Sequence, residues 1–151
     1  MPPPAPHPSM VFDPVAWQWM PPESLTPDIQ AAMRRINEAA GQARQRFITD
    51  LPGQEMIYKA KLNEAQAYLA AGEPEDLTGY PLLAAEVGIT TQTAYQLAVI
   101  WLWMAEIWIQ AAAQIEAIRL SGIAAVQSAQ DIEGVSAAEE AATSALGAIQ
   151  P

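Results

Sequence analysis

Residues 94–109 read AYQLAVIWLWMAEIWI and carry three of the five tryptophans of the chain. On the 3.6-residue period of a helix, a narrow stripe along this segment is polar at both ends and apolar in the middle. The middle is therefore apolar all round, which predicts a helix that its own domain or a neighbouring subunit covers on every side. The stripe consists of Gln92, Gln96, Val99, Trp103, Glu106, Gln110 and Gln114.

The three tryptophans of this helix do not share one environment. Trp101 and Trp108 are seven residues apart and share one face, which is the spacing of core side chains. A ligand pocket lined by tryptophans is the less favoured interpretation of the same pair. Trp103 points elsewhere, among the glutamines, and we interpret it as a subunit contact, with a core position as the alternative.

Composition limits the classes of protein that this chain can belong to. Its 151 residues suffice for one domain, or for a modest helical core with arms. Much of the apolar 51% is alanine, which favours helix and close packing between helices. The net charge of −10 argues against a nucleic-acid partner. The absence of cysteine excludes disulfides and thiolate metal sites.

Neither a signal peptide nor a membrane span is expected. The N-terminus, MPPPAPHPSM, has no basic segment followed by an apolar one, as a signal peptide requires. The uninterrupted apolar run from Leu97 to Ala105 is much shorter than the ~20 residues that a bilayer needs. Polar residues then recur at helical spacing from Glu106 onward.

Residues 1–23 form an arm rich in proline, which favours extended or polyproline conformation over helix or sheet. In an extended chain, Val15, Trp17 and Trp19 would lie on one side. Disordered tails rarely contain two tryptophans, so we expect the arm to dock. Whether it docks on its own helices or on a partner stays open.

Two helices are predicted to follow and to form an antiparallel hairpin. Thr26 and Pro27 suit the start of the first helix, and apolar residues then repeat at helical spacing as far as Phe47. The segment at positions 50–53 breaks the pattern. A second helix is expected from about Gln54 to Ala71, with Gly72 after its C-terminus.

Three more helices complete the prediction. A short helix is expected from Leu82 to Val87, followed by the long Trp-rich helix, capped at Thr90 or Thr91. The long helix extends to about Ser128, with Gly122 as a weak point. A capping box of Ser136 and Glu139 then predicts a last helix, whose thin alanine stripe suggests weak packing or the need for a partner.

No constellation of residues predicts catalysis or metal binding. The only histidine, His7, lies between prolines in the arm and has no support for an imidazole ligand or base. The acidic loop that includes Glu73, Glu75 and Asp76 lacks the spacing of a calcium loop. Six of the seven basic residues lie between positions 34 and 61, interleaved with acids, which favours a solvated helix face. We therefore expect no enzyme activity, cofactor or metal.

From about residue 36 to residue 137 the chain contains three consecutive blocks: INEAAGQARQRFITDLPGQEMIYKAKLNEAQAYL, then YPLLAAEVGIT, then a Trp/Ala-rich helix ending IEAIRLSGIAAVQSAQDIEGVSAA. These blocks resemble small helical proteins encoded among the tail and tail-fibre genes of tailed bacteriophages and prophages. The most specific pieces are Pro52-Gly53-Gln54 with Tyr58 and Lys59, and Tyr80-Pro81 with the segment at positions 85–90.

The resemblance implies a structural or fibre-assembly component of a virion, with no catalytic residues. Its expected location is the tail region of the particle, after synthesis in the bacterial cytoplasm. The expected partners are further copies of itself and other tail or fibre proteins. A trimer is one expected state, since phage fibres commonly have threefold symmetry. The arm lies outside the resemblance.

Together these observations predict an all-α fold: a small helical bundle made of a helical hairpin and the long Trp-rich helix, with an extended arm. The expected parts are the arm (1–23), a helical domain (24–128) and an Ala-rich C-terminal helix (129–151). The predicted function is that of a non-enzymatic virion component. A tail-fibre assembly chaperone and a glycan- or small-molecule-binding module are the alternatives. The predicted protein contacts are Phe12, Val15, Trp17, Trp19 and Trp103.

Overall fold

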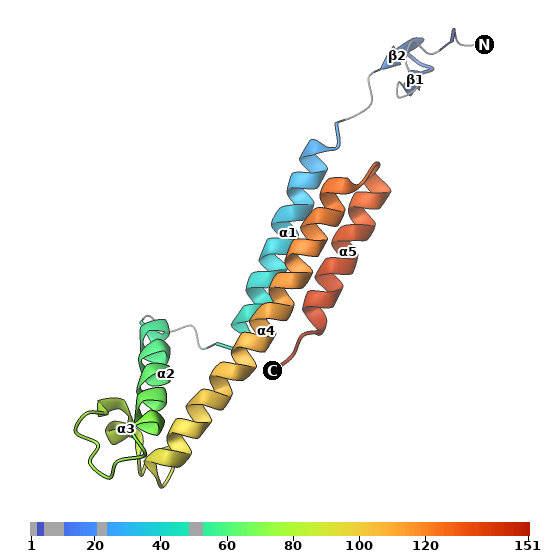
Figure 1. Ribbon diagram of the computed structural model, residues 1–151. Helices are drawn as coiled ribbons and strands as arrows, with labels where there is room; N and C mark the ends of the chain where they lie inside the picture. The colour runs from blue at the N-terminus through green and yellow to red at the C-terminus, as the bar shows by residue number, and fades with distance from the viewer. Residues whose placement is uncertain (1–2, 5–10, 21–23, 49–52) are drawn as a thin grey trace.

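The structure, a computed structural model, describes residues 3–4, 11–20, 24–48 and 53–151. This part of the chain is mostly helical and contains almost no strand, which confirms the predicted all-α class (Figure 1). A two-stranded antiparallel hairpin near the N-terminus is the exception. The elements are β1 (Val11–Asp13), β2 (Gln18–Met20), α1 (Thr26–Gln45), α2 (Gln54–Ala70), α3 (Pro81–Glu86), α4 (Ala94–Ser128) and α5 (Ile132–Ala148).

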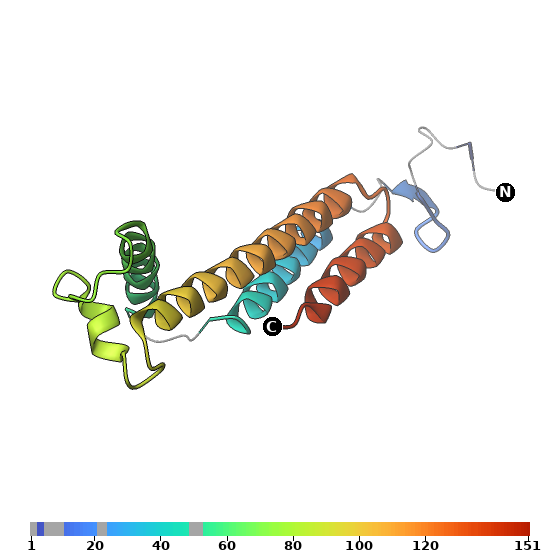
Figure 2. The ribbon, with the colours of Figure 1, turned by 60° about the horizontal axis from the view of Figure 1, so that its bottom comes forward.

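Helix α4 is the spine of the molecule. Its 35 residues span about 52 Å, and its two halves pack against different partners. The C-terminal half lies beside α1 and α5, whereas the N-terminal half lies beside α2 and α3 (Figures 1 and 2). The fold therefore contains two small cores that share one helix.

The larger core lies between α1, α5 and the C-terminal half of α4. Its fully buried large side chains include Ile36, Ile115, Val126 and Leu146, which come from all three helices. Alanines fill the remaining core positions of α1, so the helices approach closely. This core is a three-helix bundle.

The smaller core lies between α2, α3 and the N-terminal half of α4. Leu83 and Leu97 are fully buried there, and Trp101 closes the core toward the middle of α4. The rings of Tyr68 and Tyr80 meet edge to face, with 5.4 Å between their centroids. Because α3 is only six residues long, its stability depends on this packing rather than on helix propensity.

The predicted hairpin of the first two helices is wrong. In the described part of the chain, α1 and α2 do not pack against each other, and each packs against a different half of α4. The apolar stripe of α1 is buried as predicted, but periodicity alone does not identify the helix against which a stripe packs. The link between them includes residues 49–52, which lie outside the described residues.

The long and last helices begin at other residues than expected. The Thr93 hydroxyl, rather than Thr90 or Thr91, caps α4 by accepting a hydrogen bond of 3.2 Å from the Gln96 amide. Asp131, rather than Ser136, caps α5 by accepting a hydrogen bond of 2.8 Å from the Gly134 amide. A Cβ on Gly134 would lie 3.1 Å from the capping carboxylate oxygen, so glycine suits the Asp131 cap.

Helix α5 packs more firmly than its thin alanine stripe predicted. It contacts both α1 and α4 and contributes Val135, Ala142 and Leu146 to the larger core. Small side chains here permit a close approach between helices, which sequence hydrophobicity alone underestimates. By contrast, the predicted end of α2 is confirmed: Gly72 has φ +79°, and the Glu73 amide donates to the Tyr68 carbonyl at 3.2 Å.

Candidate interaction surfaces

The face of α4 that points away from both cores is rich in exposed apolar side chains. Trp103 is 63% exposed, Tyr95 48% and Val99 40%. These three side chains lie on one stripe with exposed Gln96, Glu106 and Gln110. Gln92, which helical periodicity put on the same stripe, precedes the helix, because α4 begins at Ala94 after the extended Thr93 cap. We call Tyr95, Gln96, Val99, Trp103, Glu106 and Gln110 the outer face of α4.

The outer face is uncovered because α2 and α3 pack on the opposite side of the same helix. Leu97 and Trp101, which point into the smaller core, lie roughly opposite Trp103 on the helical wheel. The apolar middle of α4 predicted a helix covered on every side, but the described chain leaves this side of it uncovered. Trp103 is a surface residue here, which excludes the alternative core position, while its role as a subunit contact stays a prediction.

The other two tryptophans of α4 lie inside or beside the cores. Trp101 is 8% exposed, as expected for a core residue, and the Lys61 ammonium lies 5.0 Å from its ring centroid. Lys61 also forms an ion pair with Glu86. Trp108 is only half-buried and contacts Phe47, with 6.4 Å between ring centroids.

Trp108 is half-buried because it lies beside an apolar groove between the two cores. The groove has a volume of about 910 Å³ and is bounded by the C-terminal end of α1, α2 and the middle of α4. Its cationic side chains have carboxylate partners: Arg44 pairs with Glu116, Lys59 with Glu55 and Lys61 with Glu86. The apolar lining includes Phe47, Leu62, Ile100, Met104, Trp108 and Ile109.

A tryptophan-lined pocket was only the less favoured interpretation of the sequence, and two of its tryptophans, Trp101 and Trp108, do line this groove, whereas Trp103 does not. The groove exists because α1 and α2 pack on different halves of α4 and leave the middle of that helix uncovered. The sequence could not locate it, because periodicity does not show which part of a helix its neighbours leave exposed.

The β1–β2 hairpin carries the other exposed apolar side chains that were predicted as contacts. Val15 is 94% exposed at the turn, and Trp17 is exposed while it meets Phe12 edge to face at 5.2 Å. Trp19 pairs with Phe12 in the strand register, but its side chain lies outside the described residues. Within the described residues, the hairpin packs against none of the helices (Figure 1).

The expectation that this arm is extended and does not form sheet is therefore wrong, because β1 and β2 pair antiparallel and a turn lies between them at residues 14–17. The Asp13 carboxylate accepts hydrogen bonds from the amides of Val15, at 2.8 Å, and Ala16, at 3.1 Å, and so stabilises a turn. Trp17 has φ +52°, which reverses the chain. Alternation of apolar residues could not reveal this turn, because a local side chain to backbone contact produces it.

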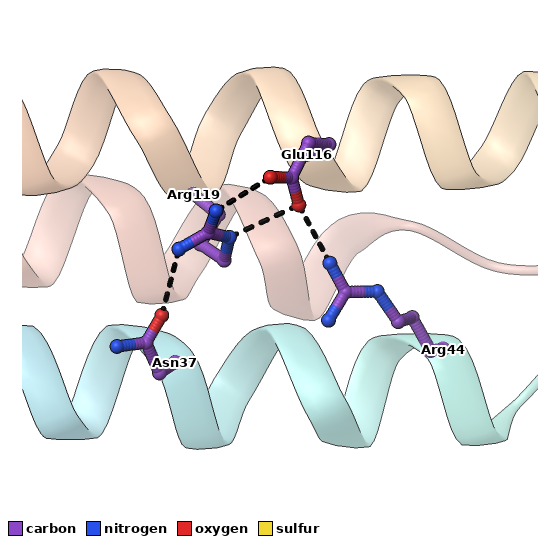
Figure 3. Close-up of polar contacts among 4 residues, drawn as sticks. All are labelled: Asn37, Arg44, Glu116 and Arg119. Carbon is purple, nitrogen blue, oxygen red and sulfur yellow. Dashed lines mark hydrogen bonds and ion pairs between the residues drawn. The ribbon is translucent and has the colours of Figure 1, made fainter.

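The basic residues form contacts between helices rather than a continuous basic surface. The Glu116 carboxylate on α4 accepts hydrogen bonds from Arg119 and, at 2.7 Å, from Arg44 on α1 (Figure 3). Arg119 also donates to the Asn37 side chain on α1 at 3.0 Å. These arginines, Arg119 first, hold the pKa of Glu116 below its ordinary value.

Two further arginines connect α1 to α5 and to the residues after it. Arg35 forms a two-pronged ion pair with Glu139, whose pKa is lowered mainly by the hydrogen bond from this guanidinium. Arg46 donates to the backbone carbonyls of Leu146, at 3.0 Å, and Ile149, at 2.8 Å. Glu139 thus pairs with another helix, not within the predicted capping box.

Neither metal chemistry nor a membrane span is established by this arrangement. Among the described residues, no group of three His, Cys, Asp or Glu side chains could hold a metal ion. Helix α4 is the only described helix that is long and apolar enough to cross a membrane by length and composition. A core or interface helix passes the same test, so the absence of a membrane span stays a prediction.

The chain matches no known protein family, no curated protein and no solved structure. The fold and its exposed surfaces are therefore the basis of the functional proposal, together with the resemblance in sequence given above.

Proposed function

We propose that this protein is a non-enzymatic assembly component that acts by binding other protein subunits. The observation that carries the proposal is the amount of exposed apolar surface at two separate places, the outer face of α4 and the tip of the hairpin. Exposing the apolar side chains of Trp103 and Val15 to water costs free energy. Exposed apolar patches of this kind are typical of protein-binding sites.

The setting that we propose is the tail, baseplate or fibre attachment region of a phage virion. This part of the proposal rests on the sequence blocks around Pro52-Gly53-Gln54 and Tyr80-Pro81. An elongated helical body with a protruding hairpin fits such a role, because the hairpin can reach a neighbour while the body contacts another (Figure 2). A fibre-assembly chaperone would use the same surfaces but would be absent from the mature particle.

A second candidate function is the binding of an apolar small molecule in the groove. Its volume of about 910 Å³ and apolar lining are typical of ligand sites. Glycan binding fits less well, because Trp101 is buried and its ring is occupied by Lys61. Quenching of tryptophan fluorescence by apolar ligands, without any change in molecular mass, would favour this second function.

The proposal is tested by purifying particles of the phage or prophage that encodes this chain, with Val15 replaced by aspartate. We expect the unmodified protein to be present in the particles at a fixed stoichiometry by quantitative mass spectrometry. The Val15→Asp protein should remain helical by circular dichroism, since Val15 is 94% exposed, but its incorporation should fall at least tenfold.

The matched control is Ile89→Asp, which adds the same charge at an 82% exposed side chain at the other end of the molecule. Its incorporation should equal that of the unmodified protein. A protein that binds fibre subunits in lysates but is missing from purified particles would support the chaperone instead. Absence from particles together with no binding to tail or fibre proteins would contradict the proposal.

A further inference from the structure

The centre of the outer face of α4 has the same order of polar and apolar residues in both directions. Counting outward from the level of Trp101, Val99 and Trp103 come first on either side, and Gln96 and Glu106 follow at equal distance. The counterpart of Tyr95 at equal distance is the half-buried, apolar Ile107. An antiparallel copy of this face would therefore place apolar residues opposite apolar ones and polar residues opposite polar ones.

We propose that two copies of the chain associate through this face, with their α4 helices antiparallel around a twofold axis near the level of Trp101. This inference deepens the proposed function, because it names a second copy as one of the bound subunits. It is independent of the phage setting and of the hairpin.

The chemistry of the opposed pairs supports this arrangement. At equal levels the large Trp103 meets the small Val99 of the partner chain, so large and small side chains alternate, as close packing between helices requires. The Gln96 amide comes to the level of the partner chain's Glu106 carboxylate, which can accept its hydrogen bond. In a parallel pair each Trp103 would meet the other, and each Glu106 would meet the other.

The apolar part of the face is large enough for the centre of a dimer interface. Tyr95, Val99 and Trp103 together expose on the order of 300 Å² per copy, whereas whole interfaces of standard size bury about 800 Å² per partner. Trp103 lies near the centre of this area, where residues that contribute most to binding are usually found. Polar residues at both ends form the rim.

A second copy fits this face better than a lipid bilayer does. The three polar side chains of the outer face would have to enter the apolar layer, with Glu106 close to the exposed tryptophan. In addition, the opposite side of α4 is already covered by α2 and α3. A one-sided apolar band with polar ends is typical of a helix–helix interface.

Cysteine cross-linking tests this orientation without background, because the chain contains no cysteine. Two variants are made separately in the full-length protein, Gln96→Cys and Glu106→Cys, both within α4. In the antiparallel dimer each cysteine lies about 15 Å along the helix axis from its own copy but level with the other variant's cysteine. A short thiol cross-linker should therefore give a covalent dimer only when the two variants are mixed.

Cross-linking of each variant with itself would overturn the antiparallel arrangement and indicate parallel association, as in a trimer. That result would still agree with the proposed function, because the protein would bind further copies of itself. No cross-link, together with a monomer mass at all concentrations, would overturn the inference entirely and leave the hairpin as the tested contact. Binding of the monomer to phosphatidylcholine vesicles would overturn it in favour of a membrane surface.

Discussion

Gly122 shows at the scale of one residue how packing overrides helix propensity. It lies in the middle of α4, where the sequence predicted a weak point because glycine is a poor helix former. In the structure the helix continues without interruption to Ser128. A Cβ at position 122 would lie 2.5 Å from the Cβ of Ala142 on α5, so only glycine permits this close approach.

We predict that Gly122→Ala destabilises the protein. The gain in helix propensity is about 1 kcal/mol, while overpacking in a filled core costs typically about 1–3 kcal/mol. The expected net loss in the free energy of unfolding is therefore up to about 2 kcal/mol, measured by urea denaturation.

Gly41→Ala in α1 is the control. No atom lies within 4 Å of its added Cβ, so it should stabilise by about 0.5–1 kcal/mol. A Gly122→Ala protein stabilised as much as the control would contradict the account.

The environment of a tryptophan could be predicted from the sequence where the spacing along one helix determines it. The seven-residue spacing of Trp101 and Trp108 placed them on one face, and Trp101 is in the core. It could not show that Trp108 would be left half-buried, because this depends on where α1 ends relative to α2. Val15 and Trp17, predicted as contacts, are exposed in the structure, and whether they bind a partner stays a prediction. The turn at Asp13 was not predicted.

At the scale of elements, ion pairs fix which helices are neighbours. Arg35 on α1 and Glu139 on α5 form the best-aligned pair, and this pair lowers the pKa of Glu139 from its ordinary value of 4.5. The folded state thus binds this proton more weakly than the unfolded state. Its contribution to stability is present above the unfolded pKa and is lost as the pH falls through the lowered folded value.

We therefore predict that Glu139→Gln weakens the dependence of stability on acid. The melting temperature of the unmodified protein should fall more steeply between about pH 5 and about pH 3 than that of the variant, followed by circular dichroism. Near pH 7 the variant should melt at a lower temperature. Glu140→Gln serves as control, since its exposed carboxylate forms no ion pair with the described residues. Identical pH profiles for all three proteins would exclude this role of the pair.

The existence and type of the helices could be predicted from periodicity, but their pairing could not. Each apolar stripe required a partner, and sequence proximity suggested that α1 and α2 form a hairpin. The structure instead packs α1 with α5, more than 80 residues further along the chain. Complementary contacts such as Arg35–Glu139 and Gly122–Ala142 select this arrangement, and neither is visible in one helix alone.

At the scale of the whole molecule, two cores on one helix produce an elongated shape with much exposed surface. Neither core covers the outer face of α4, and the groove between the cores leaves further apolar side chains exposed. The net charge of −10 keeps separate molecules apart by repulsion, so binding has to depend on well-fitted local surfaces. This combination is typical of a subunit that binds specific neighbours.

Light scattering coupled to size exclusion, on the unmodified protein and on Trp103→Glu, measures whether the outer face of α4 joins two copies. We expect the unmodified protein to have twice the 16.3 kDa mass of the chain, and Trp103→Glu to be a folded monomer. Leu120→Glu, which alters a 52% exposed side chain elsewhere on α4, should remain a dimer. An unmodified protein that is monomeric at every concentration, or a Trp103→Glu protein that remains dimeric, would contradict the claim that the outer face of α4 is a subunit contact.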